Sequence, residues 1–266
     1  RTTYVGTTDT NYKGEIDRVV ITREDAQYLI NGVNENFPGV KLTIEDIESS
    51  WAGLRPLIHE DGKSASELSR KDEIFISPSG LYSIAGGKLT GYRKMAERIV
   101  DMVIDNHPRR REISKCYTDK IRLSDGQLIH SKSVRRYVNQ LKKRMTSLGV
   151  DPEHAHYFVE NYGKQTEKII KDVKTIDSGD IHLTLIKEEV RYCVEREMTC
   201  SSVDFFMRRT GRLYFDIESV LKYKEEVTNE LALLLNWSDE AKRNDRDRLE
   251  TAVNEARNFL KNAESK

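Results

Sequence analysis

The sequence predicts an α+β protein, in which a part with mixed strands and helices is followed by an all-α C-terminal domain. Over about the first hundred residues, β-branched runs alternate with segments whose apolar residues recur at helical spacing. Beyond Ile121 the helical spacing continues almost without interruption. The predicted helices of this second part span residues 132–148, 152–162, 164–173, 184–198, 202–209, 217–235 and 238–261.

Composition narrows the classes of protein that this chain can belong to. With 266 residues and 37% hydrophobic side chains, it can form one large domain or two modest ones. Lysine plus arginine total 44, as do aspartate plus glutamate, so no overall field draws the chain onto nucleic acid. Any basic site must be local.

Cysteine usage and hydropathy bear on location. The three cysteines form no C-x-x-C pair, and an odd count favours free thiols in a reducing compartment, so we expect a cytoplasmic protein. No run approaches the roughly 18 apolar residues that a spanning helix needs. Membrane association, where it exists, is therefore expected to be peripheral. No metal site is predicted.

The N-terminal part opens on strand signals. The chain starts without a methionine in the β-branched run Thr2–Thr8, which predicts a strand whose partners lie upstream, as in a fragment of a longer protein. A second strand is predicted around Arg18–Ile21. A helix capped by Thr22 and Asp25 should follow, with Ala26, Leu29, Ile30 and Val33 as its apolar stripe.

A hairpin and a helix are predicted next. Residues 73–77 and 81–85 flank Pro78-Ser79-Gly80, the pattern of two strands around a tight turn. A helix from Thr90, with Thr90 as its cap, to about Asn106 should follow the glycine pair, with Met95, Ile99, Met102 and Val103 facing inward. The predicted domains are thus residues 1–108 and 121–266, joined by a linker at 109–120.

The segment Gly86-Gly87-Lys88-Leu89-Thr90 could bind an electron-rich or anionic group. Two glycines let backbone approach a ligand closely, and the helix that follows aims its amides and positive dipole end at it. Lys88 adds a full charge. The spacing is not that of a Walker phosphate loop. On these residues alone, the alternative of a structural strand-to-helix turn with an exposed lysine is favoured.

Arg55 lies in W-A-G-L-R-P-L, residues 51–57, at the end of a strand-like run. Gly53 permits close approach of a planar ring, and Pro56 biases the backbone of Arg55 to extended states. A guanidinium there can bind phosphate or donate to a carbonyl oxygen. The alternative is a surface arginine that closes a strand.

Together these segments carry a family resemblance. In order along the chain they read V-G-T-T-D (5–9), W-A-G-L-R-P-L, S-R-K-D-E-I-F (69–75) and I-A-G-G-K-L-T-G-Y-R-K-M-A (84–96). This order resembles FAD-dependent glycerol-3-phosphate dehydrogenases. Glu188–Met198 and S-V-D-F-F-M-R-R-T-G (202–211) are similar to the C-terminal domain of that family. The amino-acid sequence of the glycine segment is most similar to that of the family's members from Gram-positive bacteria.

The resemblance implies a function. In the family, glycerol 3-phosphate transfers hydride to FAD, giving dihydroxyacetone phosphate, and electrons pass to membrane quinone. It implies that Arg55 and Lys88 are catalytic and contact substrate oxygens, with Thr7 also in the substrate pocket. The backbone residues expected against the flavin are Gly53, Gly86, Gly87, Leu89 and Thr90. The resemblance also implies that the intact protein associates peripherally with the inner face of the cell membrane and forms a homodimer.

Two departures from the family pattern matter. No G-x-G-x-x-G occurs in the chain, although the family binds the FAD pyrophosphate with that fingerprint. The histidine base of the family also has no match among the six histidines. We therefore expect this chain alone to be inactive and to retain no FAD.

Two rival functions stay open. A glycerol-3-phosphate oxidase resembles the dehydrogenase in the same motifs but passes its electrons to oxygen. In a rival of another class, the chain is a non-catalytic interaction module, in which the helical domain docks a partner and the glycine turn is only structural.

Overall fold

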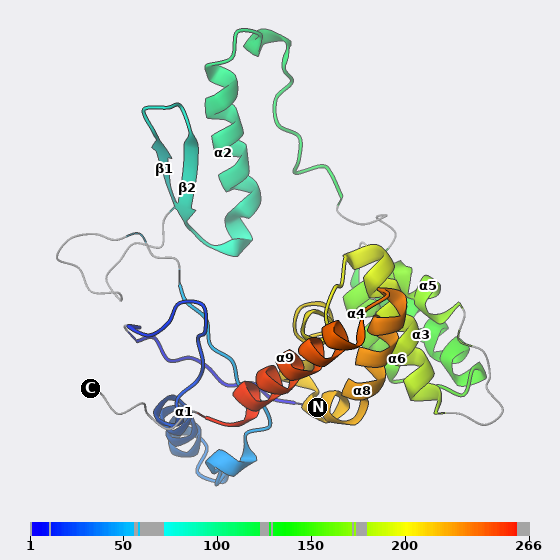
Figure 1. Ribbon diagram of the computed structural model, residues 1–266. Helices are drawn as coiled ribbons and strands as arrows, with labels where there is room; N and C mark the ends of the chain where they lie inside the picture. The colour runs from blue at the N-terminus through cyan, green and yellow to red at the C-terminus, as the bar shows by residue number, and fades with distance from the viewer. Residues whose placement is uncertain are drawn as a thin grey trace. The chain divides into compact units, whose positions relative to one another are not determined.

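The computed structural model describes residues 2–10, 12–55, 58, 72–122, 128, 130–171, 173 and 180–259 (Figure 1). The chain separates into two compact units. The helical unit comprises Arg1–Thr8, Val20–Ala52 and Gln127–Lys266, and the hairpin unit comprises Asp9–Val19 and Gly53–Gly126. These units group residues by contact, and the domain boundaries expected at residues 108 and 121 stay a prediction.

The α+β class and the helical second part are confirmed. Within the described residues the helices of this part are α3 (Ser131–Ser147), α4 (His154–Tyr162), η4 (Gly163–Gln165), α5 (Thr166–Ile170), α6 (Ile181–Glu197), η5 (Asp204–Arg209), α7 (Arg212–Phe215), α8 (Ile217–Leu234) and α9 (Asp239–Arg257). η5 is a π-helix, in which the Thr210 amide donates to the Phe205 carbonyl over 3.0 Å. The sequence predicted a helix there without indicating its wider turn.

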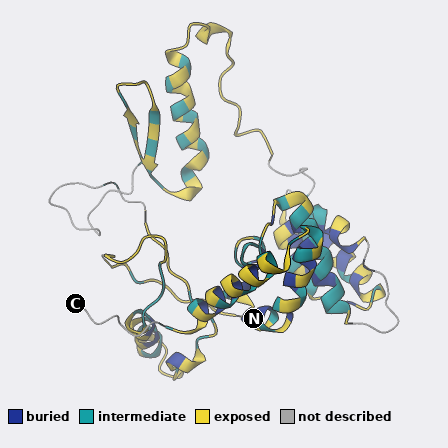
Figure 2. Ribbon diagram, in the orientation of Figure 1, coloured by how far each residue is buried: buried dark blue, intermediate teal, exposed yellow. Residues whose placement is uncertain are grey.

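The apolar faces of these helices close on a single core. α6 packs along α8, and α3 along α4. Figure 2 shows buried residues concentrated on the inner sides of these helices. Phe158, Phe205 and Phe206 are fully buried. Because burying a large apolar side chain stabilises a fold by about 1.5–3 kcal/mol, this core accounts for much of the stability of the helical unit.

A buried ion pair lies inside this core. The Glu189 carboxylate on α6 accepts hydrogen bonds from Arg212 Nη2 (2.6 Å) and from the hydroxyls of Tyr157 (2.7 Å) and Tyr162 (2.8 Å). Arg212 also donates to Ser219 Oγ at 2.8 Å. Burial, reinforced by the Glu189 charge, raises the pKa of Tyr157, so this phenol stays a donor. The network links the four helices α4, α6, α7 and α8.

The predicted first helix is confirmed. α1 spans Arg23–Asn36 and begins with a capping box, in which Thr22 Oγ1 accepts from the Asp25 amide (3.2 Å) and the Asp25 carboxylate accepts from the Thr22 amide (3.2 Å). Ala26 and Ile30 of the predicted stripe are buried. The short helix η1 (Ile44–Asp46) begins with Thr43, as the Thr43–Asp46 spacing indicates.

The strands predicted at the start of the chain are not formed. Residues 2–8 and 18–21, and the run at 47–55, have no strand in the structure. A β-branched run becomes a strand only when a neighbouring strand takes up its backbone hydrogen bonds, which these segments lack here. The Ser50 amide instead donates to the Ala256 carbonyl (2.8 Å), and Ser49 Oγ to the Leu213 carbonyl (2.7 Å). These bonds tie the segment to the helices of its own unit.

The predicted hairpin is confirmed. Strands β1 (Asp72–Ile76) and β2 (Tyr82–Gly86) pair antiparallel, with Ile74 opposite Ile84. The strands begin and end one residue away from the predicted bounds. The turn closes with a hydrogen bond from the Gly80 amide to the Ser77 carbonyl (2.9 Å). Gly80 has φ of +81°, a conformation that glycine adopts without strain.

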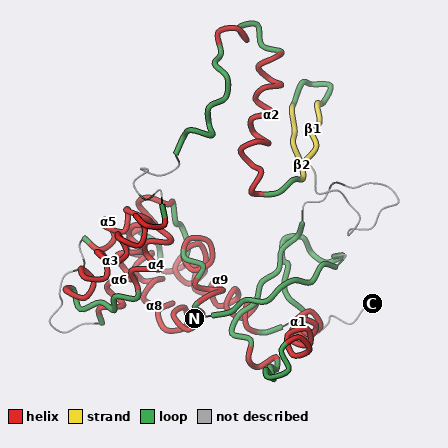
Figure 3. The backbone as a smooth tube through the Cα atoms, turned by 180° about the vertical axis from the view of Figure 1, so that it is seen from behind, coloured by secondary structure: helices red, strands yellow, loops and turns green. Residues whose placement is uncertain are grey.

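Helix α2 (Tyr92–Asp105) lies beside the hairpin (Figures 1 and 3). Arg98 forms an ion pair with Asp72 of β1, and Asn106 Nδ2 donates to the Tyr82 hydroxyl at 3.0 Å. Met95, Ile99 and Met102 of the predicted stripe are half-buried, whereas Val103 is exposed. No described residue of the hairpin unit is fully buried (Figure 2). The unit therefore has a packed layer but no closed core.

Candidate functional site

The glycine pair forms a sharp turn between β2 and the helix that follows. Gly86 and Gly87 both have φ of +76°, in the left-handed region that favours glycine. A Cβ added at Gly87 would lie 2.8 Å from Met95 Sδ and 3.1 Å from Asp72 Cβ. Gly87 therefore lets α2 approach β1 closely, a packing reason for glycine that the sequence did not reveal.

The helix begins later than predicted. A 3₁₀ turn, η2 (Leu89–Gly91), precedes α2, and the Gly91 amide donates to the Lys88 carbonyl at 2.8 Å. The predicted cap at Thr90 is wrong, because the extra turn places Gly91 at the N-cap and Thr90 inside η2, and no side chain caps α2. The first turn of α2 also contains no acidic residue. Its positive dipole end is thus not neutralised by its own first turn.

The residues after the glycine pair project into solvent. Lys88 and Thr90 are exposed, and the Leu89 side chain is 88% exposed. Within the part of the chain that the structure describes, no carboxylate pairs with Lys88. The other two cations of this end, Arg93 and Lys94, both bind Glu97 (2.8 Å each). The hydrogen bond from Lys94 contributes most to lowering the pKa of Glu97, which therefore stays ionised. Of these three cations, Lys88 is therefore the one without a carboxylate partner among the described residues.

Arg55 pairs with an acidic residue that the sequence analysis did not single out as functional. Its Nη1 lies 3.6 Å from Oδ2 of Asp9, and both side chains are partly exposed. Asp9 follows the run Gly6-Thr7-Thr8, so its only sequence signal was a place within that family motif. The restraint predicted from Pro56 lies outside the described residues. A Cβ at Gly53 would meet no atom within 4 Å, and its predicted place beside a ring stays a prediction.

Thr7 belongs to the helical unit and lines a cavity of about 740 Å³ there. Its hydroxyl donates to the Thr8 carbonyl at 3.0 Å. Trp51 and Tyr214, whose ring centroids lie 5.0 Å apart, form part of the same wall. The rest of the lining is mostly the N-terminal segment and the inner face of α1. Arg55 and Lys88 belong to the hairpin unit.

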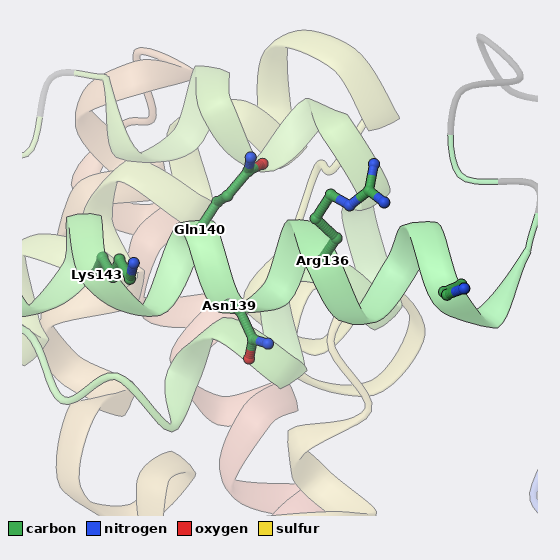
Figure 4. A pocket seen from close by; sticks show the side chains of 5 residues that line it. Arg136, Asn139, Gln140 and Lys143 are labelled. Carbon is green, nitrogen blue, oxygen red and sulfur yellow. The ribbon is translucent and has the colours of Figure 1, made fainter.

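A second hollow, of about 430 Å³, lies on the outer face of α3 (Figure 4). It is lined by Lys132, Arg136, Asn139, Gln140 and Lys143, all from this one helix. Figure 4 shows Arg136 and Gln140 projecting to one side of the helix and Asn139 to the other. No second element contributes to the lining, so we interpret this hollow as a solvated basic helix face.

The described residues form neither a metal centre nor a membrane-spanning helix. Across the described ranges, no three His, Cys, Asp or Glu side chains gather as they would around a metal ion. The His154 ring lies beside His182, with centroids 5.1 Å apart. Nor is any helix of the described residues both long and apolar enough to cross a bilayer.

Comparison with known proteins gives the class first. Residues 116–242 match the family model described as the C-terminal domain of alpha-glycerophosphate oxidase. This range begins within residues 109–120, the predicted linker, and runs through the helical part into α9. The helical part described above is therefore similar to that C-terminal domain.

Curated relatives and a solved structure then define the family. The chain is 42% identical over 259 residues to the aerobic glycerol-3-phosphate dehydrogenase of Bacillus subtilis, covering 96% of this chain and 47% of that protein. The Staphylococcus epidermidis enzyme is 41% identical over 257 residues, with 96% and 46% covered. The X-ray structure of the glycerol-3-phosphate dehydrogenase from Bacillus halodurans complexed with FAD matches with a TM-score of 0.81 and 38% identity, over 97% of this chain and 50% of that one.

This chain belongs to the family of aerobic glycerol-3-phosphate dehydrogenases, FAD-dependent enzymes, and corresponds to the C-terminal half of its members. It spans about half the length of the curated relatives it matches. The family resemblance read from the ordered motifs is thus confirmed.

Proposed function

We propose that this chain forms the C-terminal half of an FAD-dependent enzyme that oxidises sn-glycerol 3-phosphate to dihydroxyacetone phosphate. The observation that carries this proposal is the likeness to the FAD-bound dehydrogenase of Bacillus halodurans, which extends over 97% of this chain. Because the likeness covers both units, it includes the glycine turn and the segment of Arg55. The relatives' names supply the substrate class.

The glycine turn fits the electron-rich edge of a flavin. The half-buried Gly86 and Gly87 and the exposed Leu89 and Thr90 lead into a helix end that has neither a side-chain cap nor an acidic residue in its first turn. Such an end stabilises negative charge placed against it by about 0.3–1 kcal/mol. Gly53 would lie against the ring. When bound, FAD accepts hydride from C2 of the substrate.

Arg55 and Lys88 would act on the substrate. Both are cations in the hairpin unit, and both have exposed side chains able to donate to phosphate or to the C2 oxygen. As a base takes the proton of the C2 hydroxyl, and before hydride departure from C2 completes the carbonyl, the oxygen has alkoxide character, which fixed positive charge stabilises. Thr7 would contribute a hydroxyl to the substrate pocket.

We further propose that the enzyme passes its electrons to membrane quinone. This requires the intact protein to reach the inner face of the cell membrane, as a peripheral protein. We also propose that the intact protein is a homodimer. The chain alone should retain little FAD, because it contains no G-x-G-x-x-G. Absorbance near 450 nm in the purified 266-residue chain, at one flavin per chain, would contradict this point.

The test is substitution in the FAD-loaded full-length protein. Arg55→Ala and Lys88→Ala should each lower kcat/KM for glycerol 3-phosphate by about 10²–10³-fold, the loss that removing one electrostatic donor produces. Stopped-flow bleaching of the flavin measures this half-reaction directly. Arg111→Ala and Lys115→Ala, exposed cations of the same unit, are matched controls. Unchanged turnover in both site variants would favour the non-catalytic module.

The second candidate is a glycerol-3-phosphate oxidase, which the description of the matched C-terminal domain favours. The two differ only in the electron acceptor. Oxygen consumption with stoichiometric peroxide, unaffected by quinone analogues, would identify the oxidase. Turnover that depends on added quinone would identify the dehydrogenase.

A further inference from the structure

The pair of Asp9 and Arg55 joins two distant parts of the chain. Asp9 begins one segment of the hairpin unit, Asp9–Val19, and Arg55 lies near the start of the other, Gly53–Gly126. Their side chains meet at 3.6 Å, between Asp9 Oδ2 and Arg55 Nη1. Among the described carboxylates, Asp9 is the one that pairs with Arg55.

Stability does not explain this contact. The two side chains are 40% and 45% exposed, and ion pairs between such exposed groups contribute little to folding. What the pair does is limit the orientations of a long, flexible side chain. The nearest contact of Asp9 is to Nη1, and a guanidinium presents five N–H donors in a fixed fork, so one carboxylate at this distance does not occupy all of them.

We propose that Asp9 is a positioning residue for Arg55, which it holds with the free side of its guanidinium turned to the anionic oxygens of the substrate. This inference rests on the proposed function of Arg55. Asp9 itself touches no substrate; it acts by reducing the number of orientations that Arg55 must give up when the substrate binds.

A carboxylate near an anionic substrate also repels it. Loss of this repulsion and loss of the positioning of Arg55 would therefore change KM in opposite directions. If charge alone mattered, Asp9→Asn would strengthen substrate binding and lower KM. If Asp9 positions Arg55, the same substitution weakens binding, because a misplaced donor loses its alignment with the bound phosphate. The sign of the change in KM therefore separates the two roles.

The experiment uses the FAD-loaded full-length protein, with rates expressed per bound flavin. Asp9→Asn should raise KM for glycerol 3-phosphate about tenfold and change kcat by less than about threefold. Asp9→Glu, which keeps the carboxylate, should recover part of this loss. Asp17→Asn is the matched control, since it changes an exposed aspartate of the same segment. A lowered or unchanged KM in Asp9→Asn would overturn the proposal.

A double-substitution cycle tests whether Asp9 acts through Arg55. In the Arg55→Ala background, Asp9→Asn should raise KM no further, because the group it positions is gone. An undiminished effect there would overturn the positioning role while leaving the proposed function intact. If Arg55→Ala by itself leaves turnover unchanged, the role of Arg55 is wrong, and the positioning of Arg55 by Asp9 fails with it.

Discussion

The helical unit and the hairpin unit treat equivalent side chains differently. Phe206 and Leu231 of the helical unit are 0% exposed, whereas Phe75 and Leu89 of the hairpin unit are 48% and 88% exposed. Both units come from segments with regular apolar periodicity. The difference lies in the layers of each unit: several helices surround the core of one, whereas among the described residues of the other, helix α2 packs on the sheet of β1 and β2 (Figures 1 and 2).

This difference separates the unit that has a buried core from the unit that contains the candidate site residues Arg55 and Lys88. A two-stranded hairpin is at best marginally stable without further layers. Arg55, Lys88 and the glycine turn all lie in this less buried unit. The buried ion pair of Glu189 and Arg212 lies in the other unit, within a fully packed core. We therefore expect substitutions of buried residues in the helical unit to cost the most stability, and substitutions of Arg55 and Lys88 to alter activity.

The largest effect is expected from Glu189→Ala. It leaves Arg212, which is 8% exposed, as an unpaired buried cation and removes the acceptor of Tyr157 and Tyr162. Breaking a buried pair in this way costs about 3–5 kcal/mol. Chemical denaturation followed by circular dichroism measures the free energy of unfolding. As the control, Glu225→Ala breaks the exposed pair with Arg246 and should cost less than about 1 kcal/mol.

A loss below about 1 kcal/mol in Glu189→Ala would mean that water reaches Arg212. The contrast between a closed and an open unit would then be much weaker than the exposed fractions indicate.

The sequence predicted the helical unit well because its helices carry their own signals. Apolar residues at helical spacing, with polar residues on the outer face, defined α3, α6 and α8 to within a few residues of their ends. Thr22 and Asp25 fixed the start of α1, since a capping box is a local interaction within four residues. The π-helix η5 gave no signal, because one wider turn leaves the apolar pattern almost unchanged.

The strands and the candidate site were harder to predict, because they depend on partners distant in sequence. Residues 2–8 have strand propensity but no neighbour with which to pair. The family motifs pointed to Arg55 and Lys88, whereas the contact of Asp9 with Arg55 joins residues 46 positions apart and left no local pattern. Gly87 was recognised as a turn residue, but its close approach to Met95 appears only in three dimensions.

An intermediate effect is expected from Gly87→Ala. The new Cβ would lie 2.8 Å from Met95 Sδ, and the residue would keep φ of +76°, so both strain and a clash result. A cost of about 1–3 kcal/mol is expected, confined to the hairpin unit. Hydrogen exchange should show faster exchange in α2 and unchanged exchange in α6. Gly80→Ala shares the positive φ but meets no atom within 4 Å, so the difference between the two variants isolates the clash. Equal protection of α2 in both would show that α2 does not depend on close contact with β1.

The smallest effect is expected from alkylation of the three cysteines, whose reaction rates measure the difference in burial between the two units. Cys116 of the hairpin unit is exposed, whereas Cys193 on α6 is fully buried, and burial raises the pKa of its thiol. Cys200 is exposed, but its hydrogen bond to Asp204 raises its pKa. Since the thiolate is the reactive form, alkylation at pH 8 should modify Cys116 first, then Cys200, and Cys193 only after unfolding. Peptide mass spectrometry over time measures the three rates.

Modification of Cys193 in the native protein as fast as that of Cys116 would show that the helical core opens readily. The two units would then differ less in solvent access than their burial indicates.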